Sequence, residues 1–266
     1  MRLVDKVALI TQASDPFATA IAVGYAKEGA NLYLQDFSAN RAKVTGIAER
    51  CKSEGRKVVT GIFDVTRGDQ VAAMTKDLIK QFSRVDILVN AASNPVHGKV
   101  FDIKEEDFES AIMVRIKSYF LTSQHIGREM ARLGKGKIIN LTSIVGKIGS
   151  GGAIPWGAAC GGVDSMTMAF AHALGSYGIH VNALARGATG SPGHYDRVSG
   201  GERLRRLPFG RLGKHEDVVG PAIFLATSDS DWVTGSVIYA DGGYTSAAVT
   251  DDFHRPGPQE WPYKEG

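Results

Sequence analysis

Short apolar runs alternate with helix-length amphipathic segments along almost the whole chain. The runs are continuous rather than alternating, which is typical of strands that are buried on both faces of a parallel sheet. The segments between them are long enough to form the helices that connect parallel strands. We therefore predict an α/β fold: a single Rossmann-like, doubly wound parallel sheet of about seven strands with helices on both faces. The predicted strands are Val7–Thr11, Leu32–Gln35, Val58–Phe63, Ile87–Asn90, Lys137–Leu141, His180–Ala183 and Val237–Tyr239.

The composition supports one domain rather than two. The chain has 266 residues, of which 43% are hydrophobic and 22% charged, so it can bury a sizeable core. No internal repeat or Pro/Ser-rich linker interrupts the pattern before a Pro-rich stretch at the end. We therefore expect one domain over residues 1–246, with a lid segment at about 188–210, followed by a tail over residues 247–266.

Charge and cysteine usage exclude several classes of protein. The formal net charge of +3 is small and dispersed, which argues against nucleic-acid binding. The chain has no apolar run of 18 residues, so no membrane span is predicted. The first strand follows the N-terminus too closely for a signal peptide, and we therefore expect a cytoplasmic protein. Cys51 and Cys160 lie far apart without ligand-like neighbours, which indicates neither a disulfide framework nor a metal site.

One stretch, residues 136–163, carries the pattern most informative about function. A predicted strand ends at Ser143, Trp156 follows thirteen residues later, and Cys160 comes four residues after that. This arrangement resembles the short-chain dehydrogenase/reductase family, whose pattern is Ser, about a dozen residues, Tyr, three residues, Lys. The resemblance implies that Tyr exchanges the substrate proton, that Lys lowers the pKa of Tyr and holds the nicotinamide ribose, and that Ser orients the substrate. In this chain Trp replaces Tyr and Cys replaces Lys.

The replaced groups cannot perform the chemistry that the resemblance implies. An indole N–H does not titrate, and a thiol supplies no cation to lower the pKa of a proton donor. Arg115 stands where the family has a relay Asn, and guanidinium only donates hydrogen bonds. We therefore expect none of Arg115, Ser143, Trp156 and Cys160 to be catalytically functional. Arg115 is interpreted instead as a structural ion-pair partner, and Ser143 as the cap of a strand end.

Cys160 offers an alternative, since a cysteine with a lowered pKa can act as a nucleophile. Such a site needs a nearby base, and His97 is the one histidine that the sequence places near the strand ends. A small buried thiol is the interpretation that we favour.

The phosphate-binding loop is altered as well. The family has Thr-Gly-x-x-x-Gly-x-Gly where this chain has residues 11–18, so that Gln12, Pro16 and Ala18 replace the three glycines. Asp15 precedes Pro16, and Asp followed by Pro is typical of the start of a helix. The carboxylate of Asp15 would then occupy the place of a phosphate, which favours an ordinary capped helix over pyrophosphate binding.

Several positions that the resemblance assigns to the cofactor keep their residue types. Asp36 corresponds to the ribose-binding acid, and Asp64 and Val65 to the pair that contacts adenine. Asn90 begins the stretch that stands where the family has Asn-Asn-Ala-Gly or Asn-Ala-Gly. Each also has a structural explanation, because Asp at a strand end stabilises turns and Asn90 can tie neighbouring strands together. The Pro-Gly that lies against nicotinamide in the family is Arg186-Gly187 here.

The last part of the chain leaves two questions open. Arg203, Arg205 and Arg206 form a basic cluster on the predicted lid, suited either to an anionic substrate such as a CoA ester or simply to a solvated or interface helix. The tail carries Phe253 and Trp261, and it either lies across a neighbouring subunit or is disordered.

Because the scaffold is kept while the chemical groups are lost, we expect a non-catalytic subunit of a hetero-oligomeric NAD-dependent dehydrogenase. An active homologue would be its partner in a heterodimer or heterotetramer and would bind NAD, whereas this chain would bind no cofactor. It is similar in kind to the inactive subunit of the two-subunit dehydrogenase that oxidises 2-(hydroxy(phenyl)methyl)succinyl-CoA in anaerobic toluene breakdown. The alternatives are non-redox chemistry of the lyase, isomerase or dehalogenase type, and a nucleotide-sensing regulatory protein.

Overall fold

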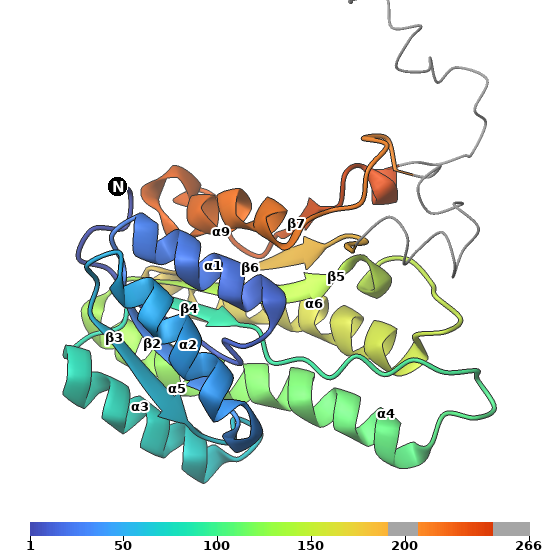
Figure 1. Ribbon diagram of the computed structural model, residues 1–266, viewed down its shortest axis with the longest axis horizontal. Helices are drawn as coiled ribbons and strands as arrows, with labels where there is room; N and C mark the ends of the chain where they lie inside the picture. Colours follow the sequence, from blue (N-terminus) through green and yellow to red (C-terminus); the bar gives the residue numbers. More distant parts are fainter. Residues whose placement is uncertain (191–206, 247–266) are drawn as a thin grey trace, which may run out of the picture.

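A computed structural model describes residues 1–190 and 207–246. Its centre is one seven-stranded parallel sheet in the order β3-β2-β1-β4-β5-β6-β7 (Figure 1). The strands are β1 (Val7–Ile10), β2 (Asn31–Asp36), β3 (Val58–Ile62), β4 (Ile87–Asn90), β5 (Gly136–Ser143), β6 (Ile179–Arg186) and β7 (Val237–Ala240). The predicted Rossmann-like fold is therefore confirmed. β5 ends at Ser143, where the motif places the end of a strand, and β6 runs on to Arg186, beyond the residues expected from the sequence.

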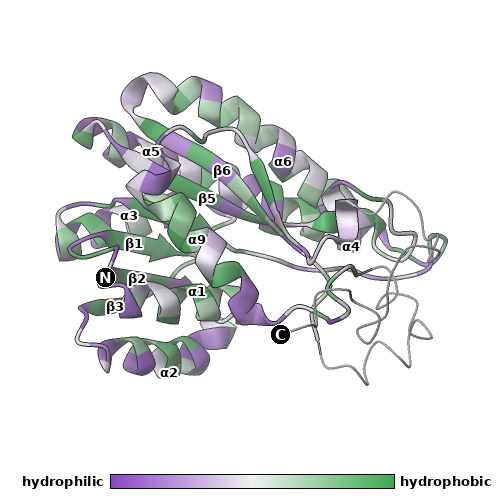
Figure 2. Cartoon of the chain, turned by 90° about the horizontal axis from the view of Figure 1, so that it is seen from above, coloured by the Kyte–Doolittle hydropathy of each residue, from purple (hydrophilic) through white to green (hydrophobic). Residues whose placement is uncertain are grey.

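The helices form a layer on each face of the sheet (Figure 2). One layer holds α1 (Pro16–Lys27), α2 (Arg41–Lys52) and α9 (Val219–Ala226). The other holds α3 (Gly68–Phe82), α5 (Ser118–Leu133) and α6 (Ile154–Leu174), with α4 (Glu105–Ile112) leading into α5. Since parallel strands need a crossover of a dozen or more residues, these helices are the connections that the chain length between strands predicted.

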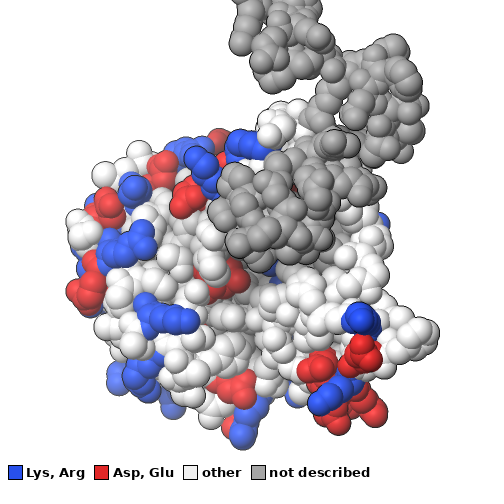
Figure 3. Space-filling model, turned by 45° about the vertical axis from the view of Figure 1, so that its right-hand side comes forward, with Lys and Arg blue, Asp and Glu red and all other residues white. Residues whose placement is uncertain are grey.

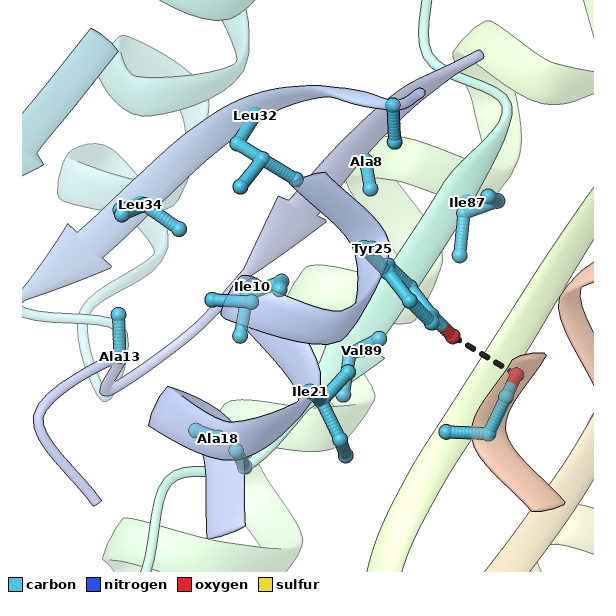
Figure 4. Packing of buried hydrophobic residues seen from close by; sticks show 14 of the residues in the cluster. Ala8, Ile10, Ala13, Ala18, Ile21, Tyr25, Leu32, Leu34, Ile87 and Val89 are labelled. Carbon is cyan, nitrogen blue, oxygen red and sulfur yellow. Dashed lines mark hydrogen bonds between the residues drawn. The ribbon is translucent and has the colours of Figure 1, made fainter. Parts of the chain in front are cut away.

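Each helix layer packs against one face of the sheet and encloses its own hydrophobic core. On one side, Ile21 and Tyr25 of α1 lie over Ile10 of β1 and Val89 of β4 (Figure 4). Tyr25 is fully buried, and its hydroxyl donates a hydrogen bond of 2.9 Å to the carbonyl of Ala222, which joins α1 to α9. The opposite core packs buried residues of α3 and α5, such as Leu78 and Ile126, against the other face of the same strands.

The strand order places the topological switch point between β1 and β4. The chain moves outward from β1 to β3 and then returns to β4 on the other side of β1. In open α/β sheets, ligands bind beyond the carboxyl ends of the strands at this point. We refer to the region around the ends of β1, β4, β5 and β6 as the carboxyl edge.

Charged side chains are intermingled on the face of the molecule drawn in Figure 3, with Lys and Arg next to Asp and Glu around a largely uncharged middle. This distribution agrees with the small net charge of +3.

Within residues 1–190 and 207–246, no helix combines the length and the apolar character that a membrane crossing requires. The predicted lid cluster Arg203, Arg205 and Arg206 and the predicted tail lie outside the described residues.

Candidate functional site

The four positions that the resemblance assigns to catalysis lie on β5, α6 and the turn before α5, and Arg115 is close enough to Cys160 to interact with it electrostatically. Ser143 is the last residue of β5, and Trp156 and Cys160 lie one turn apart on the first half of α6, which has Pro155 in its first turn. Cys160 is fully buried and Trp156 is 9% exposed. The interpretation of Cys160 as a small buried thiol is therefore confirmed, and a nucleophilic role would require access that this position does not give.

Arg115 occupies the place of the relay Asn without reaching any carboxylate by a hydrogen bond. It lies in a π-helical turn, Met113–Lys117, between α4 and α5, and is 3% exposed. Its guanidinium donates to the carbonyl of Leu141 at 2.6 Å and to the hydroxyl of Ser93 at 2.7 Å. The expected ion pair is thus replaced, among the described residues, by hydrogen bonds to neutral oxygens that link the turn before α5 to β5 and to the loop after β4.

The loop after β1 has the closed form that Asp15 and Pro16 predicted. Asp15 caps α1, and its carboxylate accepts hydrogen bonds from the backbone N–H groups of Phe17 (2.9 Å) and Ala18 (3.3 Å). Pro16 has no N–H, so these are the first amides of the helix that could face an anion. The carboxylate of Asp15 therefore occupies the anion position at the start of α1.

Gln12 takes over the position of the first glycine in a left-handed backbone conformation with φ 43°. Its side chain bonds the backbone of Ser93 in both directions, accepting from the N–H at 2.6 Å and donating to the carbonyl at 3.3 Å. The side chain of Gln12 therefore bridges the ends of β1 and β4 across the switch point.

The N-cap gives a direct prediction for stability. Asp15→Ala is expected to lower the free energy of unfolding by about 1 kcal/mol, because two helix amides lose their acceptor. Asp15→Asn keeps the acceptor oxygen and should cost less. Urea unfolding followed by circular dichroism measures both, and equal losses in the two variants would show that charge, rather than capping, is what matters.

The carboxylate of Asp36 is hydrogen-bonded within the chain. It is fully buried, and one carboxylate oxygen accepts from the N–H of Ser14 at 2.7 Å. The other accepts from the N–H of Phe37 and the side-chain amide of Asn40, both at 2.8 Å. The structural explanation, an aspartate that organises its own turn, accounts for all these bonds.

The polar residues after β3 also form their hydrogen bonds within their own turn. One oxygen of Asp64 accepts from both the N–H and the hydroxyl of Thr66, at 2.9 and 2.7 Å. The side chain of Val65 is fully buried and belongs to the core around α3 and α5. A hollow of about 260 Å³ remains next to them, lined by Phe37, Ser38, Ile62, Phe63, Asp64 and Gln70.

Asn90 belongs to a buried hydrogen-bond network that ties β4 to β5 and α5. Its amide donates to Asn140 at 2.8 Å and to the hydroxyl of Ser123 at 3.1 Å, and its oxygen accepts from Thr122 at 2.6 Å. Asn140 in turn donates to Thr167 on α6 at 2.9 Å. The strand-tying interpretation of Asn90 is confirmed.

A stack of side chains covers the end of β6. The guanidinium of Arg186 lies 4.4 Å from the ring centroid of Phe17 and 4.9 Å from that of Trp156. The rings of His97 and Trp156 meet edge to face with their centroids 5.2 Å apart, which confirms the predicted place of His97 near the strand ends. His215 meets Phe17 edge-on at 4.8 Å. We call Phe17, Arg186 and Trp156 the Arg186 stack.

Little in the local sequence predicts this stack. Arg186 was recognised as a cation in place of an apolar turn, but Phe17 and His215 were not identified. A large aromatic residue directly after Pro16 was the available signal for Phe17. Nothing in the local sequence around His215 indicates that it reaches α1, because this contact depends on how α9 packs.

Unpartnered polar atoms remain beneath the carboxyl edge. Nε1 of Trp156, Oγ1 of Thr142 and Oδ1 of Asp164 are buried without a hydrogen-bond partner in the described part of the chain. Burial raises the pKa of Asp164 from its ordinary value of 3.8 to about 6, although the nearby hydroxyl of Thr142, which is not placed for a full hydrogen bond, and the charge of Arg115 both lower it. Asp164 therefore ionises at a cost in the folded protein.

Asp164 predicts a pH-dependent stability. Because its pKa is higher in the folded chain than in the unfolded one, the folded protein holds the proton more tightly, and stability should fall as pH rises from about 4 to about 6. Asp164→Asn should remove this fall, which we put at about 1–2 kcal/mol after allowing for the partial solvent contact of the side chain. Urea unfolding at a series of pH values measures it, with the exposed Asp102→Asn as control. A wild-type curve parallel to that of Asp164→Asn would contradict the prediction.

A second hollow lies at the opposite, amino end of the sheet and has a volume of about 520 Å³. Its lining mixes both signs of charge, and Lys137 forms an ion pair of 2.8 Å with Asp231 across it. It is remote from the carboxyl edge, and its mixed charges favour neither an anionic nor a cationic ligand.

Among the described residues, no group of three or more His, Cys, Asp or Glu side chains is placed to hold a metal ion.

Comparisons with known proteins agree with the fold and the motif spacing. The family described as enoyl-(acyl carrier protein) reductase matches residues 13–245. The chain is 33% identical to the 3-oxoacyl-[acyl-carrier-protein] reductase FabG of Thermotoga maritima, over 91% of this chain and 99% of that protein. It is also 33% identical to the (2S)-[(R)-hydroxy(phenyl)methyl]succinyl-CoA dehydrogenase subunit BbsD of Thauera aromatica, over 91% and 98%.

A solved structure extends the comparison to a bound cofactor. A gluconate 5-dehydrogenase from Burkholderia cenocepacia, in complex with NADP and tartrate, superposes with a TM-score of 0.86 at 30% identity, over 92% of this chain and 97% of that chain. The likeness therefore covers nearly all of the fold, including the strands that build the carboxyl edge.

Proposed function

Since the chain belongs to the short-chain dehydrogenase/reductase family of oxidoreductases, we propose that it is the non-catalytic subunit of a hetero-oligomeric NAD-dependent dehydrogenase. The observation that carries the proposal is Trp156 at the tyrosine position, with Arg186 over its ring and His97 at its edge. An indole in this place cannot exchange a proton with a substrate.

The neighbouring positions do not supply a substitute. Cys160 is fully buried at the lysine position and carries no positive charge that would lower the pKa of a proton donor. Arg115 directs its donors at Leu141 and Ser93, so it offers no acceptor to a relay water. Ser143 alone, without an adjacent base, is a weak nucleophile.

The residues do not fit a dinucleotide in the family's usual mode. The first free amides of α1 are bonded to Asp15, and both oxygens of Asp36 are bonded within the chain. Nicotinamide dinucleotides are nevertheless the ligand class to test, because a solved relative binds NADP. We propose that NAD is bound by the active partner.

Exposed apolar side chains on three helices support a partner subunit. Phe108 on α4, Phe120 on α5 and Met168 on α6 are 43%, 42% and 56% exposed, and Phe120 contacts Phe170 of α6 at 6.0 Å between ring centroids. Apolar surface of this kind marks protein interfaces. The family resemblance implies that these helices pack against another subunit, in a heterodimer or a heterotetramer.

For the substrate of the complex we propose an acyl thioester such as a CoA ester. Two relatives at 33% identity are named for acyl-carrier-protein and CoA substrates, and one of them is itself named as a subunit. A hydroxyacyl-CoA such as 2-(hydroxy(phenyl)methyl)succinyl-CoA is the specific candidate within this class.

The native complex provides the test. The full chain, tagged and purified from its source, should bring down one homologue that carries Tyr-x-x-x-Lys, in stoichiometric amount by native mass spectrometry. The complex should oxidise a hydroxyacyl-CoA with NAD, whereas this chain alone should not. Purification of a homo-oligomer alone would refute the proposal and redirect the search to non-redox chemistry around Ser143 and Cys160.

A nucleotide-sensing role is a second candidate, favoured by the hollow of about 260 Å³ beside Phe37 and Asp64. The hollow lies where the resemblance places adenine. Saturation-transfer NMR with adenosine, AMP and NAD tests it: contacts from the adenine protons of all three ligands, without turnover, would support this role, and their absence would remove it.

A further inference from the structure

We infer that the Arg186 stack is an internal substitute for the nicotinamide ring, which closes the carboxyl edge and stabilises the fold without a dinucleotide. The observation behind it is the position of a flat cation between two aromatic rings, at 4.4 Å from Phe17 and 4.9 Å from Trp156. The ring of an oxidised nicotinamide is also flat and positively charged, so the same two faces could hold either group.

The stack joins the ends of three elements. Phe17 comes from the first turn of α1, Arg186 from the end of β6, and Trp156 from the first turn of α6. These elements lie on both sides of the switch point between β1 and β4. A bound ligand commonly bridges the two halves of such a sheet at this place.

The backbone holds Arg186 in position. Its neighbour Gly187 packs so tightly on the end of β7 that an added Cβ would lie 2.6 Å from the Cα of Asp241. Arg186 is also paired with Ser143 and Ala240 in the sheet register. The side chain therefore starts from a fixed point, which lowers the entropic cost of the stacked geometry.

Two histidine rings contact the aromatic rings of the stack. His97 and His215 meet the outer rings edge-on, at 5.2 and 4.8 Å between centroids. Edge-to-face contacts are the favourable arrangement for such rings. The stack is thus continuous with side chains from the loop after β4 and from the turn His215–Val218 before α9.

Thermal unfolding of the full chain tests the inference. Arg186→Ala should lower the Tm by about 3–8 °C, because both cation–π contacts are lost. Arg186→Lys keeps the charge without the flat guanidinium group, so its Tm should lie between those of the wild type and of Arg186→Ala. Exposed Arg132→Ala is the matched control, expected to change the Tm by less than about 2 °C. Unchanged Tm in Arg186→Ala would overturn the inference.

A ligand titration of the wild-type protein gives a second readout that does not depend on a variant. About 1 mM NAD should leave the wild-type Tm unchanged, whereas a ligand with a micromolar Kd would raise it by several degrees. Such a rise would overturn the inference. Because both experiments use this chain alone, a missing partner would refute the proposed function and leave the inference intact.

Discussion

The double variant Trp156→Tyr/Cys160→Lys, which restores the two side chains missing from the family pattern, is expected to show no dehydrogenase activity and to lose about 3–5 kcal/mol of its free energy of unfolding. Cys160 is fully buried, and its Cβ lies 3.0 Å from the point where a Cβ on Gly146 would stand. A lysine there would be desolvated. It would also repel Arg115, which is close enough to Cys160 to interact electrostatically.

Activity should stay absent for a separate reason. The restored tyrosine would still face Arg186, and Asp15 would still occupy the helix amides that a pyrophosphate needs. Urea unfolding and an NADH-linked assay measure the two effects. Cys160→Met is the matched control, because methionine is about as long as lysine but uncharged. It should lower the free energy of unfolding clearly less than Cys160→Lys does. NADH-dependent turnover by the double variant would show that Asp15 and Arg186 close the edge less firmly than proposed.

Asn90→Ala is expected to lower the free energy of unfolding by about 2–4 kcal/mol, although Asn90 is a residue that the family resemblance associates with cofactor binding. The substitution removes hydrogen bonds to Asn140, Ser123 and Thr122, all of which are buried. The partner atoms then remain in an apolar environment without water, and that desolvation is the main cost.

Asn94 provides a control with the same chemical change. Its amide donates to the hydroxyl of Ser110 at 2.8 Å, but the pair is exposed, so water can replace the bond. Asn94→Ala should therefore change stability by less than about 0.5 kcal/mol. Chemical denaturation measures both variants, and similar losses would mean that the network around Asn90 contributes little beyond a single exposed bond.

Local sequence patterns predicted the parts of the site that depend on neighbours along the chain. The Asp15-Pro16 pair predicted the capped start of α1, and the structure confirms the cap. The spacing of Ser143, Trp156 and Cys160 predicted a strand end followed by a helix, and the structure has Ser143 at the end of β5 and both other residues on α6.

Predictions about side-chain partners were less complete. Arg115 was expected to form an ion pair, but its hydrogen bonds go to Leu141 and Ser93. Asp36 kept the residue type of a ribose-binding acid, yet both oxygens of its carboxylate accept hydrogen bonds within the chain, from Ser14, Phe37 and Asn40. The direction of a side chain depends on which elements surround it, and this information is distributed over the whole chain.

The sequence by itself determined the succession of strands and helices along the chain and the parallel sheet. It also determined that the titratable groups are lost at the family's catalytic positions. These follow from hydrophobic periodicity and from residue identity, which need no knowledge of distant contacts. Only the tertiary structure decided that Phe17, Trp156 and Arg186 stack with one another. Their elements are up to 169 positions apart, from Phe17 to Arg186, and they meet because the switch in strand order carries α1, α6 and the end of β6 to the same edge.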